Sequence, residues 1–144
     1  MTLWPKISIE VDNKYNNCFG CGLTNPVGLK LEFKWDGTTA TAEFTPGEVY
    51  QGWPGMVHGG ILMCLLDEAI GYAARFHGVN CVTAGMQTRF KQMVPVCEPL
   101  IISAYVKKKN RKLVESKAVI SLKDGTQVAE GVAKQFVVNI DNGV

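Results

Sequence analysis

The sequence lacks an apolar run long enough to cross a membrane, because no uninterrupted stretch reaches the roughly 18 residues that a span requires. Its first eight residues contain no apolar segment of the kind found in secretory signal peptides, so we expect no signal peptide. It also lacks a strong net charge: the value is +2, which argues neither for nor against a polyanionic partner. These absences lead us to expect a globular protein of the cytoplasm with no membrane partner.

The cysteines are too scattered for a disulfide scaffold, and the cysteines and histidines together are too few for a zinc site. The five cysteines are an odd number, and Cys64 falls inside an apolar run, which indicates a reduced protein. Cys18 and Cys21 resemble half of a zinc site, but structural zinc usually takes two such pairs. No second pair exists, because His58 and His77 are isolated. We therefore expect no metal and no cofactor; a redox role for the cysteine pair lacks the strand–helix context typical of such motifs.

The length and composition fit one globular domain. The chain has 144 residues, of which 47% are hydrophobic and 19% are charged, and that balance supports a packed core. We found no internal repeat and no linker composition. The sequence therefore predicts a single domain over residues 1–144, with a core at 17–138 and an N-terminal arm at 1–16.

The element around which the chain is organised is a glycine-rich turn at 52–60 followed by a helix at 61–76. Residues 61–66 are all apolar, which predicts a helix that is apolar on every side and therefore buried. Asp67 and Glu68 stand in the middle of that helix. A carboxylate in such a place needs a partner or a function.

The rest of the sequence has the patterns of strands. Alternation predicts a half-buried strand at 29–34, and Asp36-Gly37 is a hairpin turn before a returning strand at 39–44. After the helix, further strands are expected at 82–90, 100–106, 112–122 and 128–138. The fold class is therefore α+β, with one long helix against five or six antiparallel strands. The sheet has to curl around the helix, and its exposed edge would pair with a second subunit.

Several motifs together resemble the PaaI-like type of hotdog-fold thioesterase, over roughly residues 17–138. They are Cys18-Phe19-Gly20-Cys21-Gly22, Asn25-Pro26-Val27-Gly28-Leu29, Gln51-Gly52-Trp53-Pro54-Gly55, His58-Gly59-Gly60, Leu65-Leu66-Asp67-Glu68-Ala69 and Thr83 to Phe90. The resemblance implies a long central helix wrapped by a curved antiparallel sheet. It also implies a homodimer, often paired into a homotetramer, that hydrolyses the thioester of an acyl-coenzyme A.

The candidate catalytic groups lie at the helix start and on one helix face. The N–H groups of Gly59 and Gly60 are at the positive end of the helix dipole, where they would polarise a carbonyl. Asp67 follows Gly60 by two helical turns and Gly71 lies one turn further, so these residues share a face. The resemblance implies that Asp67 is general base or nucleophile, acting with the Gly59 amide of the other subunit. A packing turn and a carboxylate that caps a loop remain the alternatives.

Three polar residues are candidates for orienting the reacting groups. His58 is suited to acid–base chemistry, but a hydrogen bond that caps the turn is the favoured role. Thr83 corresponds to a Ser or Thr that positions water or the carboxylate in relatives, and an ordinary strand threonine is the alternative. Some relatives hold water with an Asn or Gln six residues before the histidine; here that position is Gly52, and Gln51 precedes it.

A basic hairpin at 107–112 offers contacts for the phosphates of coenzyme A, with Lys109 and Arg111 as candidates. Arg89 and Lys91 are rival contacts. A solvated hairpin tip is the alternative. Because no aromatic residues are interleaved with the basic ones, we expect no nucleic-acid partner.

These residues and the resemblance together predict an acyl-CoA thioesterase that acts without a cofactor. A loop at Cys18–Cys21 would cover the acyl end of its pocket. The alternatives are a hydratase or dehydratase on the same fold, and a non-catalytic module that binds acyl-CoA. The sequence does not identify the acyl group.

Overall fold

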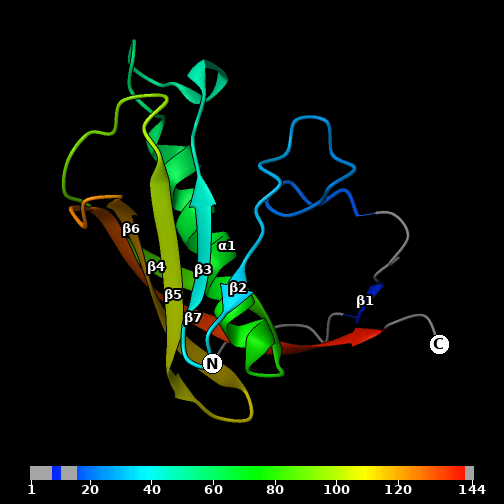
Figure 1. Ribbon diagram of the computed structural model, residues 1–144. Coiled ribbons are helices and arrows are strands. Elements are labelled where there is room, and N and C mark those ends of the chain that lie inside the picture. Colours follow the sequence, from blue (N-terminus) through cyan, green and yellow to red (C-terminus); the bar gives the residue numbers. More distant parts are fainter. Residues whose placement is uncertain (1–7, 11–15, 142–144) are drawn as a thin grey trace.

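The computed structural model describes residues 8–10 and 16–141. Its elements follow the chain in an order that places one long helix between two groups of strands (Figure 1). The elements are β1 (Ser8–Glu10), β2 (Lys34–Trp35), β3 (Ala40–Phe44), η1 (Glu48–Tyr50), α1 (Gly59–Phe76), β4 (Asn80–Phe90), β5 (Leu100–Lys109), β6 (Leu113–Leu122) and β7 (Gln127–Asp141).

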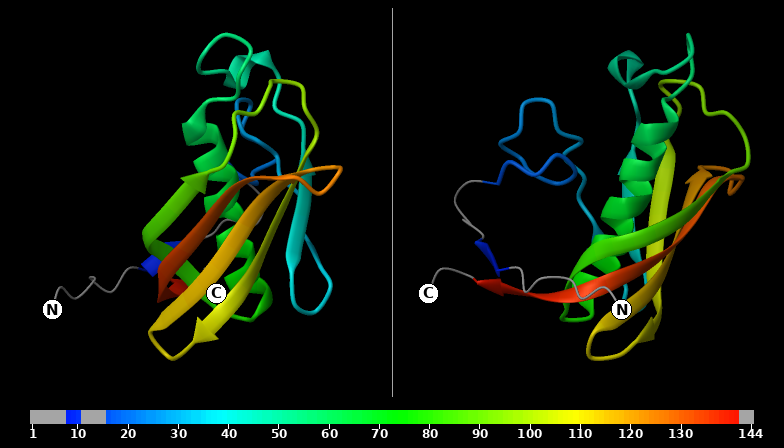
Figure 2. Two further views of the ribbon diagram at one scale, coloured as in Figure 1. Left: turned by 90° about the vertical axis from the view of Figure 1, so that its left-hand side faces the viewer. Right: turned by 180° about the vertical axis from the view of Figure 1, so that it is seen from behind.

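Six of the strands form an antiparallel sheet in the order β4-β7-β6-β5-β3-β2. The short β1 pairs in parallel with the end of β7, at Asn139–Asp141. The sheet curves across one side of α1, so the helix packs against its inner face (Figure 2). The predicted α+β fold, one helix on five or six antiparallel strands, is confirmed. Of the expected N-terminal arm at 1–16, the structure describes β1 and Asn16; the rest lies outside the described residues.

The helix buries one face only. Its fully buried residues recur every three or four positions, as expected for an amphipathic helix, and are Leu62, Leu65, Leu66, Ala69, Ile70, Ala73 and Ala74. The prediction of burial on every side is wrong for this chain, because Met63 is 39% exposed and Asp67 is also exposed. The apolar run at 61–66 hides this periodicity, since its outward positions are apolar too.

The helix begins and ends at recognisable caps. At its start, the His58 side chain accepts a hydrogen bond from the Gly60 N–H, which satisfies one of the unpaired amides of the first turn. At its end, Gly78 adopts a φ of +84° and its N–H donates to the Arg75 carbonyl. A left-handed residue after the last turn is a common helix stop. No helix among the described residues combines the length and hydropathy needed to span a membrane.

The predicted strand at 29–34 is much shorter in the structure. Leu29 and Leu31 are buried, as the alternation predicts, but only Lys34 and Trp35 pair with β3. Lys30 adopts a φ of 52°, which interrupts an extended strand. The N–H groups of Leu29 and Leu31 donate instead to carbonyls of the preceding loop, at 2.8 and 2.9 Å. These bonds tie the Cys18–Cys21 loop to the core.

Candidate active site

A polar cavity lies between the outer face of α1, the start of β4 and the Cys18–Cys21 loop. Its volume is about 640 Å³. The lining residues come from these three elements and from β7, and they are Asn16, Cys18, Cys21, Asp67, Glu68, Gly71, Tyr72, Arg75, Asn80, Cys81, Val82, Thr83 and Gln135. Three candidates from the sequence, Asp67, Gly71 and Thr83, thus line one cavity.

Asp67 and Thr83 form a direct contact at this cavity. The Thr83 hydroxyl donates a hydrogen bond of 2.6 Å to Asp67 Oδ1. The contact joins the middle of α1 to the start of β4, where the pairing with β7 shifts between Thr83 and Gly85. Such a bulge re-aims nearby side chains. Asp67 Oδ2 has no hydrogen-bond partner among the described residues, so it is the oxygen available to a ligand.

Gly71 supplies space rather than a contact. A Cβ atom at this position would meet nothing within 4 Å. It lies one helical turn beyond Asp67 on the same face, so it leaves room beside the carboxylate.

Glu68 faces a different part of the cavity. Cys18 Sγ lies 4.0 Å from Glu68 Oε1, and the side chain is half-buried. Burial raises the pKa of the Glu68 carboxyl, and the neighbouring charge of Asp67 raises it further, while a hydrogen bond from Cys21 opposes the shift. Burial also raises the pKa of the Cys21 thiol to about 11, although a hydrogen bond with Tyr72 works in the opposite direction.

The two glycines at the helix start differ in their availability. The Gly60 N–H donates to His58 Nδ1 at 2.8 Å, so this amide is already engaged. The Gly59 N–H has no partner among the described residues. A Cβ on Gly59 would contact only the Phe90 ring, at 3.8 Å. Gly59 therefore offers an open donor at the positive end of the helix dipole.

One chain does not bring this donor to the carboxylate. Gly59 and Asp67 are eight residues apart on one helix, which corresponds to about 12 Å along the axis. A thioester carbonyl polarised at Gly59 is therefore out of reach of Asp67 in the same chain. A second cavity, of about 420 Å³, lies beside Gly59 and is lined mainly by apolar residues, including Trp53, Leu62 and Phe90.

The remaining candidate residues are spread over other surfaces. Gln51 holds the glycine-rich turn, since its Oε1 accepts from the Gly55 N–H at 3.1 Å. Lys91 Nζ lies 2.9 Å from Gln127 Oε1 and 3.6 Å from Glu130. Arg89 lines a separate groove on the outside of β4 and β7, together with Glu130.

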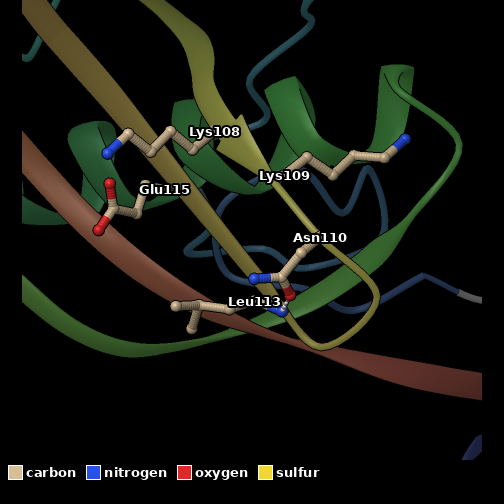
Figure 3. A pocket seen from close by; sticks show the side chains of 5 residues that line it. All are labelled: Lys108, Lys109, Asn110, Leu113 and Glu115. Carbon is tan, nitrogen blue, oxygen red and sulfur yellow. Dashed lines mark hydrogen bonds between the residues drawn. The ribbon is translucent and has the colours of Figure 1, made fainter.

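The basic hairpin divides its charges between two sides. Figure 3 shows the side chains of Lys108 and Lys109 pointing in opposite directions beside a shallow cavity. Lys109 Nζ reaches the His77 carbonyl at 3.4 Å, at the end of α1. It is close enough to Cys81, a cavity residue, to lower the pKa of that thiol against the dominant effect of burial. Arg111 is exposed at the hairpin. Lys109 is therefore the basic candidate nearest the Asp67 cavity.

The sequence interpretation missed Gln135. This side chain is fully buried, lines the cavity, and lies opposite Thr83 in the ladder between β4 and β7. Its Oε1 accepts from Ser116 Oγ at 3.1 Å, while its Nε2 has no partner among the described residues. The alternation Ala129, Gly131, Ala133 and Gln135 was the signal that places it on the inner face.

The fold and the cavity define the class of protein. A long helix wrapped by a curved antiparallel sheet, with a carboxylate on the open side of the helix, is the hotdog fold that the resemblance implies. The family described as "Thioesterase superfamily" matches residues 54–129, more than half of the chain. The chain belongs to the thioesterase superfamily.

Curated relatives match the chain over part of their length. The acyl-coenzyme A thioesterase THEM4 of Bos taurus is 34% identical over 88 residues, which cover 60% of this chain and 36% of that protein. The acyl-coenzyme A thioesterase THEM5 of Homo sapiens is 38% identical over 53 residues, covering 37% of this chain and 22% of that protein. The chain thus spans between about a fifth and two fifths of the length of the curated relatives it matches.

Solved structures share the fold at low sequence identity. A protein from Streptococcus pneumoniae described as a hypothetical thioesterase, solved with coenzyme A, superposes with a TM-score of 0.71 at 19% identity, covering 76% of this chain and 86% of that one. The PaaI protein of E. coli gives a TM-score of 0.71 at 21% identity, covering 75% and 83%. These likenesses show the hotdog architecture.

Proposed function

We propose that the protein hydrolyses the thioester of an acyl-coenzyme A. The observation that carries this proposal is the hydrogen bond between Thr83 and Asp67 in a cavity next to open space at Gly71. Matched relatives are named acyl-coenzyme A thioesterases. Structures of the same fold are described with coenzyme A from S. pneumoniae and with acetyl-CoA from Streptococcus mutans.

The sequence separation of two residues in a solved protein of this fold supports a functional role for the pair Asp67 and Thr83. The S. pneumoniae thioesterase was also solved as an aspartate-to-alanine and as a threonine-to-alanine variant, and the two substituted positions are sixteen residues apart in that protein. Asp67 and Thr83 are separated by the same sixteen residues here. The pair therefore corresponds to residue types singled out in a protein of this fold.

Asp67 is the residue that activates the nucleophile. With the Thr83 hydroxyl fixed on Oδ1, the free Oδ2 accepts a proton from water, and the water oxygen attacks the thioester carbon. The carbon–sulfur bond then breaks, and the proton held by Asp67 passes to the departing thiolate. Direct attack by Asp67, followed by hydrolysis of the anhydride, uses the same contact. Neither route needs a cofactor.

The carbonyl oxygen is polarised by the Gly59 N–H of a second copy. In one chain that N–H and Asp67 are about 12 Å apart along the helix, so a complete site needs two chains. β4 is a suitable edge for pairing, because no residue along its length is fully buried and its only partner among the described strands is β7. The protein is therefore a homodimer in this proposal, and two dimers can form a homotetramer.

Basic residues on the surfaces around the cavity receive the phosphates of coenzyme A. Lys109 is favoured because it lies beside the cavity, with Arg111 next along the hairpin. Arg89 is the alternative contact. Lys91 is a weaker candidate, since Glu130 already lies 3.6 Å from its Nζ. Gln51 and His58 shape the turn that presents Gly59.

The setting proposed for this activity is the cytoplasm, and the chain works as one domain. The free state of all five cysteines supports a reducing compartment.

The experiment that tests the function is a thiol-release assay over short, long and aromatic acyl-CoA substrates. Wild type is expected to release thiol from at least one of them, and Asp67→Asn to lose most of the rate. Glu43→Gln, which neutralises an exposed carboxylate on β3, is the matched control and should retain the rate.

Two outcomes would overturn the proposal. Binding of every acyl-CoA without thiol release would favour the non-catalytic module. Addition of water to an enoyl-CoA without thiol release would favour the hydratase.

A further inference from the structure

A second group of reactive side chains lies on the other side of the Asp67 cavity. Cys18 Sγ, Cys21 Sγ and a carboxylate oxygen of Glu68 all lie within 4.8 Å of one another. They come from two segments fifty residues apart in the sequence. The mechanism above uses none of the three.

The loop that carries the two thiols is held in a fixed shape. The Gly22 N–H donates to the Cys18 carbonyl at 2.9 Å, which closes the turn around both cysteines. A Cβ on Gly22 would overlap the backbone of Cys18, so the turn requires glycine there. Two further backbone bonds, from Leu29 and Leu31, join this loop to buried residues of the core. The thiols are therefore positioned before any ligand arrives.

The carboxylate is fitted to the same loop. A Cβ on Gly20 would overlap the Glu68 carboxylate, so the missing side chain at Gly20 gives Glu68 its place beside the thiols. No Lys or Arg nitrogen of the described residues lies within 4.0 Å of Glu68. Three groups that become anionic on deprotonation are thus gathered without an ion pair, although the positive charge of Arg75, which lines the same cavity, acts on Glu68 from a longer distance and lowers the pKa of its carboxyl.

We propose that Cys18, Cys21 and Glu68 bind a zinc ion that clamps the Cys18–Cys21 loop onto α1. Two thiolates and one carboxylate are a donor set that suits zinc, whereas magnesium and calcium favour oxygen alone. Tetrahedral zinc places neighbouring sulfur and oxygen ligands roughly 3.5 to 3.8 Å apart. The present separations, at most 4.8 Å, need to contract by no more than about 1.3 Å to meet that geometry. The fourth position is filled by water from the cavity.

Zinc explains the cluster better than a disulfide between the two cysteines does. A disulfide requires a sulfur–sulfur distance of about 2 Å and would leave Glu68 without a partner. Zinc binding releases the protons of both thiols and places a positive ion beside the half-buried Glu68 carboxylate, which lowers the net charge of the three deprotonated ligands from −3 to −1. The ion takes no part in the hydrolysis proposed above, so each proposal can fail without the other.

The test is a metal titration of the reduced, metal-free protein. Cobalt(II) serves as the spectroscopic probe, because thiolate ligation gives a charge-transfer band, and zinc is then added in competition. We expect one ion per chain, displacement of cobalt by zinc, and a higher melting temperature with zinc. Cys18→Ser and Cys21→Ser should abolish the band, and Glu68→Gln should weaken binding by roughly tenfold or more.

Cys97→Ser is the matched control, since Cys97 is an exposed free cysteine away from the cluster, and it should bind as wild type does. Circular dichroism of the metal-free variants shows whether each one is folded, and the band is compared only among folded proteins. The proposal is overturned if reduced wild type shows no saturable binding, or if binding persists in Cys18→Ser and Cys21→Ser. It is also overturned if the two cysteines form a disulfide in preference to binding zinc under reducing conditions.

Discussion

Asp67 and Glu68 are adjacent on α1, yet the two sides of the helix give them different chemistry. Successive residues of a helix point about 100° apart, so one carboxylate turns to β4 and the other to the Cys18–Cys21 loop. Asp67 is exposed and accepts a hydroxyl hydrogen bond. Glu68 is half-buried beside two thiols. The comparison teaches that the neighbours supplied by each side, more than the carboxyl group itself, decide the role of each acid.

The sharpest way to break this comparison is to neutralise each acid in turn. Asp67→Asn should lower kcat roughly 10²- to 10⁴-fold, because the general base is lost. Glu68→Gln should change kcat by less than about tenfold, since it lies outside the hydrogen bond to Thr83. Steady-state thiol release measures both variants. Equal losses of kcat in the two variants would contradict the different roles assigned to Asp67 and Glu68.

Removing the proposed oxyanion donor should have the next largest effect. Gly59→Pro deletes the N–H, and proline is favoured at the first position of a helix. His58 has extended dihedral angles, φ −62° and ψ 133°, which suit a residue before proline. We expect a loss of roughly 10²- to 10³-fold in kcat. Gly59→Ala keeps the N–H and is the control; a similar loss in both variants would argue for packing alone.

The hydroxyl on the β4 side can be removed with little change of shape. Thr83→Val should lower kcat roughly ten- to a hundredfold, because a hydrogen bond to a charged group is lost. Thr83→Ser keeps the hydroxyl and should recover most of the rate. If Thr83→Val keeps the wild-type kcat while Thr83→Ser loses it, the Thr83 methyl group rather than its hydroxyl matters.

The environment of Glu68 beside the Cys18–Cys21 loop should affect how the stability of the protein depends on pH. Burial raises the pKa of Glu68 above its ordinary value of 4.5. A raised carboxyl pKa means that this residue favours folding at low pH, and the contribution is lost as pH rises through the folded-state pKa. Metal-free Glu68→Gln should therefore gain melting temperature relative to wild type as pH rises from 4 to 7. A constant difference across this range would contradict the assignment.

Much of the fold follows from the sequence because period and turn residues are strong signals. The helix and the strands after it are at the expected places, and Asp36-Gly37 and Gly78 mark real chain reversals. The buried side of α1 could not be identified, since both sides of its first two turns are apolar. The strand predicted at 29–34 was too long, because the left-handed Lys30 and the bonds from Leu29 and Leu31 depend on the loop they join.

The candidate site was predicted only in part, because some of its contacts depend on loops that are distant in the sequence. Helical spacing groups Asp67 with Gly71, and the family resemblance added Thr83, which the structure brings to 2.6 Å from the carboxylate. The meeting of Glu68 with the two cysteines depends on a loop fifty residues earlier. No local pattern encodes a contact of that kind. The same limit applies to a site that needs a second chain.

The most direct test of the account is a mixed dimer of Asp67→Asn and Gly59→Pro chains. Each variant alone should be nearly inactive. When differently tagged chains are co-expressed in equal amounts, one site of each mixed dimer combines an intact Asp67 with an intact Gly59 N–H. We predict recovery of roughly a quarter of wild-type activity, since half of the dimers are mixed and each has one complete site. Activity no higher than that of the parent variants, with mixed dimers verified by both tags, would contradict a site shared between two chains.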